Sequence, residues 1–164
     1  MEIIALATWL TTAAFGLYLF AVWLIEHDGS KGGGTASRLR APVIFSHVLL
    51  AATGLVVWVL YLYLDQTRIA WTAFFILLLV AILGFIMLTR WIPVHRAANA
   101  RAEAALAAHT GSGPRGADPV ALPGTDPAGP PERNFPVPVV VAHGFFAVIT
   151  VTLVTLTAFG LIGS

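Results

Sequence analysis

Four of the five histidines in this chain belong to two copies of one pattern of chemistry-bearing residues. In each copy a glycine precedes a tryptophan by seven positions, the tryptophan precedes a histidine by four, and a proline precedes a second histidine by five. The first copy comprises Gly16, Trp23, His27, Pro42 and His47, and the second comprises Gly84, Trp91, His95, Pro138 and His143. This self-similarity predicts an internal repeat. Its imidazoles are candidate ligands for a metal ion or a cofactor.

The composition indicates where these histidines must lie. Hydrophobic residues make up 58% of the 164 residues and charged residues only 10%, whereas a soluble domain has about 25% charged residues. Four apolar stretches, at about 3–25, 42–64, 70–92 and 137–162, each exceed the roughly 20 residues that a membrane-spanning helix needs. We therefore predict an all-α integral membrane protein, with 1–164 forming a single membrane domain. Its expected architecture is a four-transmembrane-helix bundle built from two parallel two-helix repeats.

The basic residues predict the orientation of the bundle. Only Arg68 lies in the short connection between the second and third stretches, at 65–69. The others lie in or beside the first and third connections: Lys31, Arg38, Arg40, Arg90, Arg96, Arg101, Arg115 and Arg133. Because positive residues favour the cytoplasmic side, we expect a multi-pass protein of the cell (inner) membrane. Both termini would lie outside, and 26–41 and 93–136 would form cytoplasmic loops.

The third connection is the least regular part of the chain. The stretch from Ala97 to Ala108 is rich in strong helix formers and would extend the third helix, with a kink at Pro93. Residues 110–136 are rich in glycine, proline and aspartate without apolar periodicity, so we expect them to be disordered.

Depth in the membrane divides the four histidines into two pairs. His47 and His143 each follow a helix-starting proline by five residues, which places both roughly 7 Å into the helix. His27 and His95 each lie one turn beyond a tryptophan, a residue that favours the membrane interface. The chain thus offers an inner pair and an outer pair of imidazoles. Ionisable groups inside a membrane usually face a partner, a cavity or a pathway.

The inner pair has the properties of two axial ligands to one haem b. Such a haem needs two imidazoles at one depth on facing helices, with small residues beside them. The candidate slot comprises Ala51, Gly54, Ala147 and Thr150. The propionates would need water or basic groups, and the candidate rim or propionate contacts are His27, His95, Arg40, Arg90 and Arg96. One bis-histidine haem near the cytoplasmic face is the central hypothesis.

With four membrane helices carrying His47 and His143, the chain resembles the four-helix membrane b-type cytochromes. The resemblance covers the membrane portion and includes no specific family signature. It implies electron transfer between carriers, with a redox partner or a larger membrane complex. Such families often hold two haems at opposite faces, whereas this sequence has no histidine near the expected outer face.

Other interpretations remain open at this stage. His27 and His95 would join the inner pair around one Zn, Cu or non-haem Fe ion if all four imidazoles converged. Alternatively, the helices would form a transporter, acting as a homo-oligomer, or a cofactor-free accessory subunit. The sequence contains no nucleophile arrangement, phosphate loop or nucleic-acid motif, so the expected surroundings are the lipid bilayer and not nucleic acid. The absence of cysteine excludes disulfides and thiolate ligands.

Overall fold

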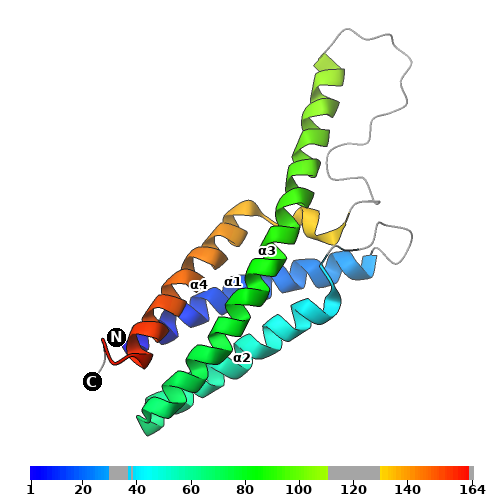
Figure 1. Cartoon of the computed structure of the whole chain (residues 1–164). Coiled ribbons are helices and arrows are strands. Elements are labelled where there is room, and N and C mark those ends of the chain that lie inside the picture. Colours follow the sequence, from blue (N-terminus) through cyan, green and yellow to red (C-terminus); the bar gives the residue numbers. More distant parts are fainter. Residues whose placement is uncertain (30–36, 38, 111–129, 163–164) are drawn as a thin grey trace.

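The computed structural model describes residues 1–29, 37, 39–110 and 130–162, and its regular elements are all helical. Four long helices form a bundle (Figure 1): α1 (Glu2–Gly29), α2 (Ala41–Leu64), α3 (Thr67–Thr110) and α4 (Val137–Ala158). A short 3₁₀ helix, η2 (Pro131–Asn134), precedes α4. Within the described residues, these four α-helices are long and apolar enough to cross a membrane. The prediction of an all-α fold with four helices able to span a membrane is confirmed.

Local chemistry fixes the ends of the helices. Proline occupies the first turn of α2 and of α4, where its missing N–H leaves no helical hydrogen bond unmade. α2 ends at Asp65, which adopts a left-handed conformation (φ 48°) and donates its N–H to Tyr61. Beyond α4, Gly160 has φ 67°, and Leu161 donates to the carbonyl of Leu156, as in a Schellman motif.

The four helices pack as two pairs. α1 lies along α4 and α2 lies along α3, while α3 and α4 form a smaller contact and α1 and α2 a smaller one still. Extensive contacts thus follow the order α1, α4, α3, α2 around the bundle. α2 and α4, which carry the inner histidines, therefore face each other diagonally across it.

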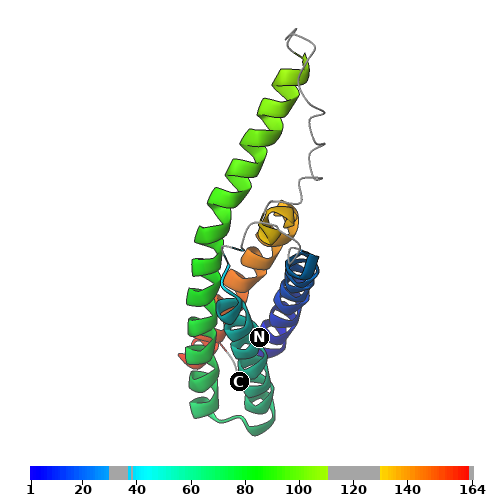
Figure 2. The same cartoon turned by 90° about the vertical axis from the view of Figure 1, so that its right-hand side faces the viewer.

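α3 extends beyond the membrane span predicted for it, in agreement with the extension predicted from the strong helix formers between Ala97 and Ala108. The expected span ended at residue 92, but the helix continues through Pro93 to Thr110. Figures 1 and 2 show it bending as it leaves the bundle and projecting beyond the other helices. Alanine-rich sequence sustains the extension, and a proline that cannot donate a helical hydrogen bond accounts for a bend. Of the segment expected to be disordered, 111–129 lies outside the described residues.

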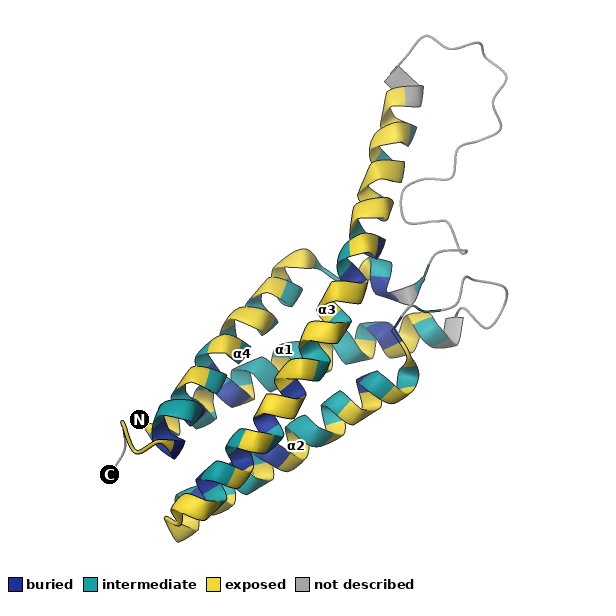
Figure 3. Ribbon diagram, in the orientation of Figure 1, coloured by how far each residue is buried: buried dark blue, intermediate teal, exposed yellow. Residues whose placement is uncertain are grey.

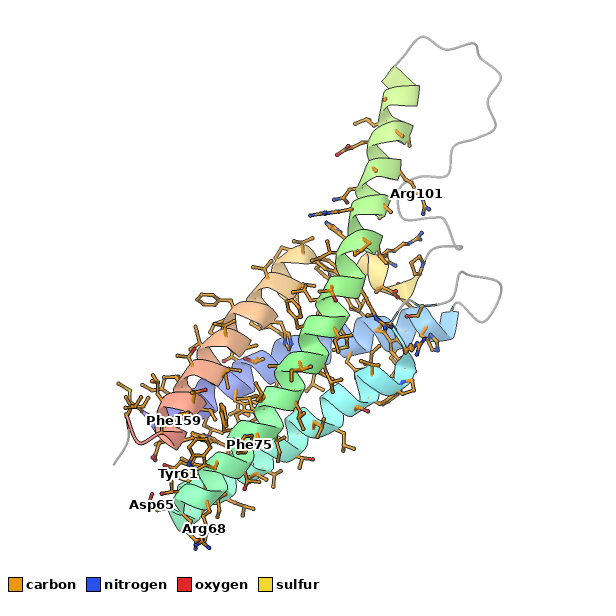
Figure 4. All side chains as sticks on the ribbon, in the orientation of Figure 1. Tyr61, Asp65, Arg68, Phe75, Arg101 and Phe159 are labelled. Carbon is orange, nitrogen blue, oxygen red and sulfur yellow. The ribbon has the colours of Figure 1, made fainter. Side chains whose placement is uncertain are left out.

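Among the described residues, Arg68 lies at the turn between α2 and α3, whereas Arg40, Arg90, Arg96 and Arg101 lie towards the opposite ends of these two helices. Figure 4 shows Tyr61, Asp65 and Arg68 where α2 and α3 meet, and Arg101 far away on the α3 extension. Where α2 and α3 meet, Tyr61 donates a hydrogen bond to the carboxylate of Glu2 and so joins α2 to α1.

The core consists of two clusters, and the outer surface of the bundle is apolar. One cluster surrounds Trp9, Trp58 and Val154, and the other surrounds Trp23, Leu39 and Ile44. On α2, His47 lies between Ile44 of the second cluster and Trp58 of the first. Figure 3 shows exposed residues covering the outward faces of the helices. They include Leu49, Phe85 and Phe145, as expected for helices in contact with lipid.

Candidate functional site

The inner histidines meet between the helices that carry them. The ring centres of His47, on α2, and His143, on α4, lie 6.4 Å apart with an angle of 58° between the ring planes. Both side chains are partly buried. The structure thus brings together the two residues that the sequence analysis selected as axial ligands.

Each of these imidazoles is held by a backbone carbonyl of a neighbouring helix. Nδ1 of His143 lies 2.9 Å from the carbonyl oxygen of Thr12 on α1. Nδ1 of His47 lies 3.1 Å from the carbonyl oxygen of Val80 on α3. A carbonyl oxygen only accepts hydrogen bonds, so Nδ1 must be the donor in both rings. In a neutral ring this leaves Nε2 with its lone pair free to bind a ligand.

A glycine lies against each imidazole, one helical turn beyond the accepting carbonyl. A methyl group at Gly16 would lie 2.9 Å from Cε1 of His143, and one at Gly84 would lie 3.2 Å from Cε1 of His47. Both glycines belong to the repeat in the sequence. Their contact with the histidines was not predicted. Each glycine follows the residue with the accepting carbonyl, Thr12 or Val80, by four positions. This spacing predicts a histidine contact only when the neighbouring helix is known.

The outer histidines stack on the tryptophans that precede them. His27 and Trp23 have ring centres 4.6 Å apart, and His95 and Trp91 have ring centres 5.0 Å apart, with the planes nearly parallel in both cases. Nε2 of His95 is also 3.1 Å from the side-chain amide of Asn99, one turn further along α3. His95 therefore has a polar partner on its own helix, towards the extension.

A buried carboxyl links the two tryptophans, and sequence reasoning missed it. Glu132, in η2, is fully buried. Ser37 donates a hydrogen bond to Oε2 of Glu132 at 2.9 Å. The backbone carbonyl of Glu132 accepts a hydrogen bond from the indole N–H of Trp91 at 3.0 Å. Ser37 also accepts from the indole N–H of Trp23 at 3.3 Å. An acidic residue in a short proline-rich connection gives no periodic signal that predicts burial.

Two of the four predicted slot residues, Gly54 and Thr150, lie at contacts with other helices. Gly54 is buried, and a methyl group there would lie 3.0 Å from both Trp9 and Ile76. Thr150 is also buried and bonds to Thr8 on α1. Ala51 and Ala147 are half-buried. The predicted rim arginines, Arg40, Arg90 and Arg96, are exposed.

Neither the four histidines nor any other described residues form a conventional metal cluster. Among the described residues, no group of three or more histidine, aspartate or glutamate side chains could hold a metal ion. The inner pair contact each other, and each outer histidine stacks on its own tryptophan. The candidate site is therefore the facing pair alone.

Comparison with known proteins finds no matching family model, no matching curated protein and no matching solved structure. Any functional conclusion must therefore come from the geometry of the chain itself.

Proposed function

We propose that this chain is a membrane-bound b-type haem protein in which His47 and His143 are the two axial ligands. The observation that carries the proposal is the facing pair of imidazoles, 6.4 Å apart and each hydrogen-bonded through Nδ1 to a backbone carbonyl. Histidines that bind metals usually donate the other ring N–H to a carbonyl or a carboxylate. Both members of the pair have that arrangement.

The separation of the rings suits ligation from opposite sides of one iron atom. Two metal–nitrogen bonds of about 2 Å, plus roughly 1 Å from each nitrogen to its ring centre, place two trans imidazoles about 6 Å apart, centre to centre. The observed 6.4 Å is close to this value. The two histidines come from helices on opposite sides of the bundle, so their side chains enter the core from opposite directions.

Bound haem b would supply one-electron oxidation and reduction, so the proposed role is electron transfer, with a redox partner or within a larger membrane complex. The protein would hold the ligands, orient them and keep water from the site with its apolar helices. Arg40 precedes His47 by seven residues, roughly 10 Å of helical rise, and Arg90 follows Gly84 by six. The proposed rim or propionate contacts are Arg40, Arg90, Arg96 and the outer histidines, His27 and His95.

The matching contacts in the two halves support descent of the bundle from two parallel two-helix repeats. Gly16 contacts His143 as Gly84 contacts His47. Equivalent residues of the first and third helices are 68 positions apart, as are Gly16 and Gly84. Equivalent residues of the second and fourth helices are 96 positions apart, as are His47 and His143. The same offsets relate Thr12 to Val80, the two positions whose carbonyls accept from the histidines.

The orientation of the chain is also a proposal, and it rests on charge. Eight of the nine basic residues lie in or beside the connections 26–41 and 93–136, and only Arg68 lies in the connection 65–69, which favours a cytoplasmic location for the first two connections. The haem would then lie in the cytoplasmic half of the cell membrane, with both termini outside.

Optical spectroscopy of the purified protein tests the function. Protein produced in haem-sufficient cells should have the spectrum of six-coordinate, low-spin haem, and His47→Ala or His143→Ala should abolish it. His109→Ala, which changes a histidine outside the repeat, is the matched control and should leave the spectrum unchanged. A colourless but folded wild-type preparation would contradict the proposal. Stoichiometric Zn or Cu in place of haem would contradict it too.

A further inference from the structure

We propose that Gly16 and Gly84 are positioning residues that set the tautomer and direction of the two inner imidazoles before any cofactor binds. Each glycine and the carbonyl one turn before it form what we call an imidazole seat: Gly16 with Thr12 for His143, and Gly84 with Val80 for His47. The consequence for iron ligation rests on the proposed function. The seat itself does not.

The glycines need an explanation because the helix does not require them. Neither has a positive φ, so neither is needed for a special backbone conformation. In a helix interior glycine costs about 1 kcal/mol relative to alanine. Space for the histidine ring supplies the reason, since a methyl group at position 16 would lie 2.9 Å from Cε1 and 3.3 Å from Nδ1 of His143.

The missing side chain is what allows the ring to reach the backbone. In a helix the carbonyl of residue 12 points towards residue 16 and already accepts that residue's N–H. Its second lone pair can accept a further bond, but only from a donor that approaches over the surface of residue 16. The ring of His143 lies there, with Nδ1 2.9 Å from the Thr12 oxygen. The same relationship joins Gly84, Val80 and His47.

The two seats are unequal. The contact at position 84 is looser, with a methyl group 3.2 Å from Cε1 and 3.8 Å from Nδ1 of His47. Alanine at position 16 must therefore displace its ring further than alanine at position 84. We expect Gly16→Ala to have the larger effect, confined to His143, and Gly84→Ala a smaller effect, confined to His47.

The chain supplies two matched controls for these substitutions. Gly144 adjoins His143 on α4, but a methyl group there would meet nothing within 4 Å. Gly54 is tightly packed, with contacts at 3.0 Å, but against Trp9 and Ile76 and no histidine. Gly144→Ala tests the effect of adding a methyl group, and Gly54→Ala tests the effect of a clash.

The first readout is the histidine tautomer in the haem-free full-length protein, measured by nitrogen-15 NMR after selective histidine labelling. Signals are assigned by their loss in His47→Gln and His143→Gln. Wild type should show both rings protonated at Nδ1. Gly16→Ala should alter the His143 signals and Gly84→Ala those of His47, whereas neither control should alter either ring. Unchanged tautomers in both seat variants would overturn the proposal, as would the same change in a control. If Gly16→Ala does not fold, Gly84→Ala decides.

The second readout is haem retention, measured as the rate of haem transfer to apomyoglobin. Loss of a hydrogen bond to the distal nitrogen of a ligating histidine weakens metal binding about 10- to 100-fold. In Gly16→Ala and Gly84→Ala we expect haem retention to fall by that order and the reduction potential to become more positive. Gly144→Ala should change neither quantity. The two proposals fail separately. Tautomer changes in a protein that binds no haem would refute the haem function alone, and unchanged tautomers in a haem protein would refute the seats alone.

Discussion

The hydroxyl oxygens of Thr150 and Thr8 lie 3.1 Å apart, in a hydrogen bond that crosses the interface between α4 and α1. Thr8 donates its own proton to Ala5 within α1, so it is the acceptor in this bond. Thr150 shares its one proton between Thr8 and the carbonyl oxygen of Phe146, which lies 2.8 Å away within α4. The repeat offsets relate these two positions to Gly54 and Ile76, which are also in contact. Equivalent places in the two helix pairs therefore hold a polar contact in one pair and an apolar contact in the other.

Replacing Thr150 with valine keeps the shape of the side chain and removes this interhelical bond. We expect the free energy of unfolding to fall by about 0.6 kcal/mol, the average for such bonds, and by no more than about 1.7 kcal/mol. Unfolding in mixed micelles at increasing denaturing detergent measures it. Thr152→Val is the control, because among the described residues its exposed hydroxyl bonds to Val148 within α4 and to no other helix. Equal losses in both variants would show that the interhelical bond contributes nothing.

The membrane spans and the inner histidine pair were predictable from sequence because each depends on a local quantity. Apolar length fixes the spans, and distance from a helix-starting proline fixes the common depth of His47 and His143. The continuation of α3 beyond its membrane span was predicted from the strong helix formers between Ala97 and Ala108, but its end at Thr110 was not. Pro93 indicated a kink, but a helix continues past proline when the residues on both sides favour helix and the freed carbonyl can find other partners.

The packing partners of the repeat residues were not predictable, because they depend on which helices are neighbours. Gly54 and Thr150 follow the histidines on one helical stripe, and that stripe predicted a slot for a planar cofactor. In the structure Gly54 meets Trp9 of α1, and Thr150 meets Thr8 of the same helix. Periodicity identifies the inward face of a helix. It does not identify the helix that covers that face.

Ser37→Ala should destabilise the end of the bundle that carries the outer histidines. Its hydroxyl bonds to Glu132 at 2.9 Å and to the indole N–H of Trp23 at 3.3 Å, and both partners are buried. Removing one partner of a buried polar group costs about 1 to 3 kcal/mol. The measurement is the free energy of unfolding in micelles. The exposed Ser46 on α2 provides the control variant Ser46→Ala, which should change it by less than about 0.5 kcal/mol. If Ser37→Ala is as stable as this control, the hydrogen bonds of Ser37 to Glu132 and Trp23 do not contribute to stability.

The proposed orientation can be tested by labelling single cysteines, because the chain contains none. Gln66→Cys would place a thiol in the exposed turn between α2 and α3, and Ala100→Cys would place one on the exposed α3 extension. Both lie outside the apolar spans. In intact cells a membrane-impermeant maleimide should label position 66 at once and position 100 only after permeabilisation. The reverse pattern would place the basic connections outside and refute the assignment of the haem to the cytoplasmic half.

The outer histidines should be dispensable for holding iron. Each stacks on its own tryptophan, and His95 also bonds to Asn99, whereas the inner histidines lie against each other. If His47 and His143 are the axial ligands, the double variant His27→Ala, His95→Ala should keep the six-coordinate haem spectrum and a haem-to-protein ratio near that of wild type. Loss of a propionate contact should instead accelerate haem release, which transfer to apomyoglobin measures. A ratio that falls by half would mean that the outer pair holds a second haem, and complete loss would mean that all four histidines act on one centre.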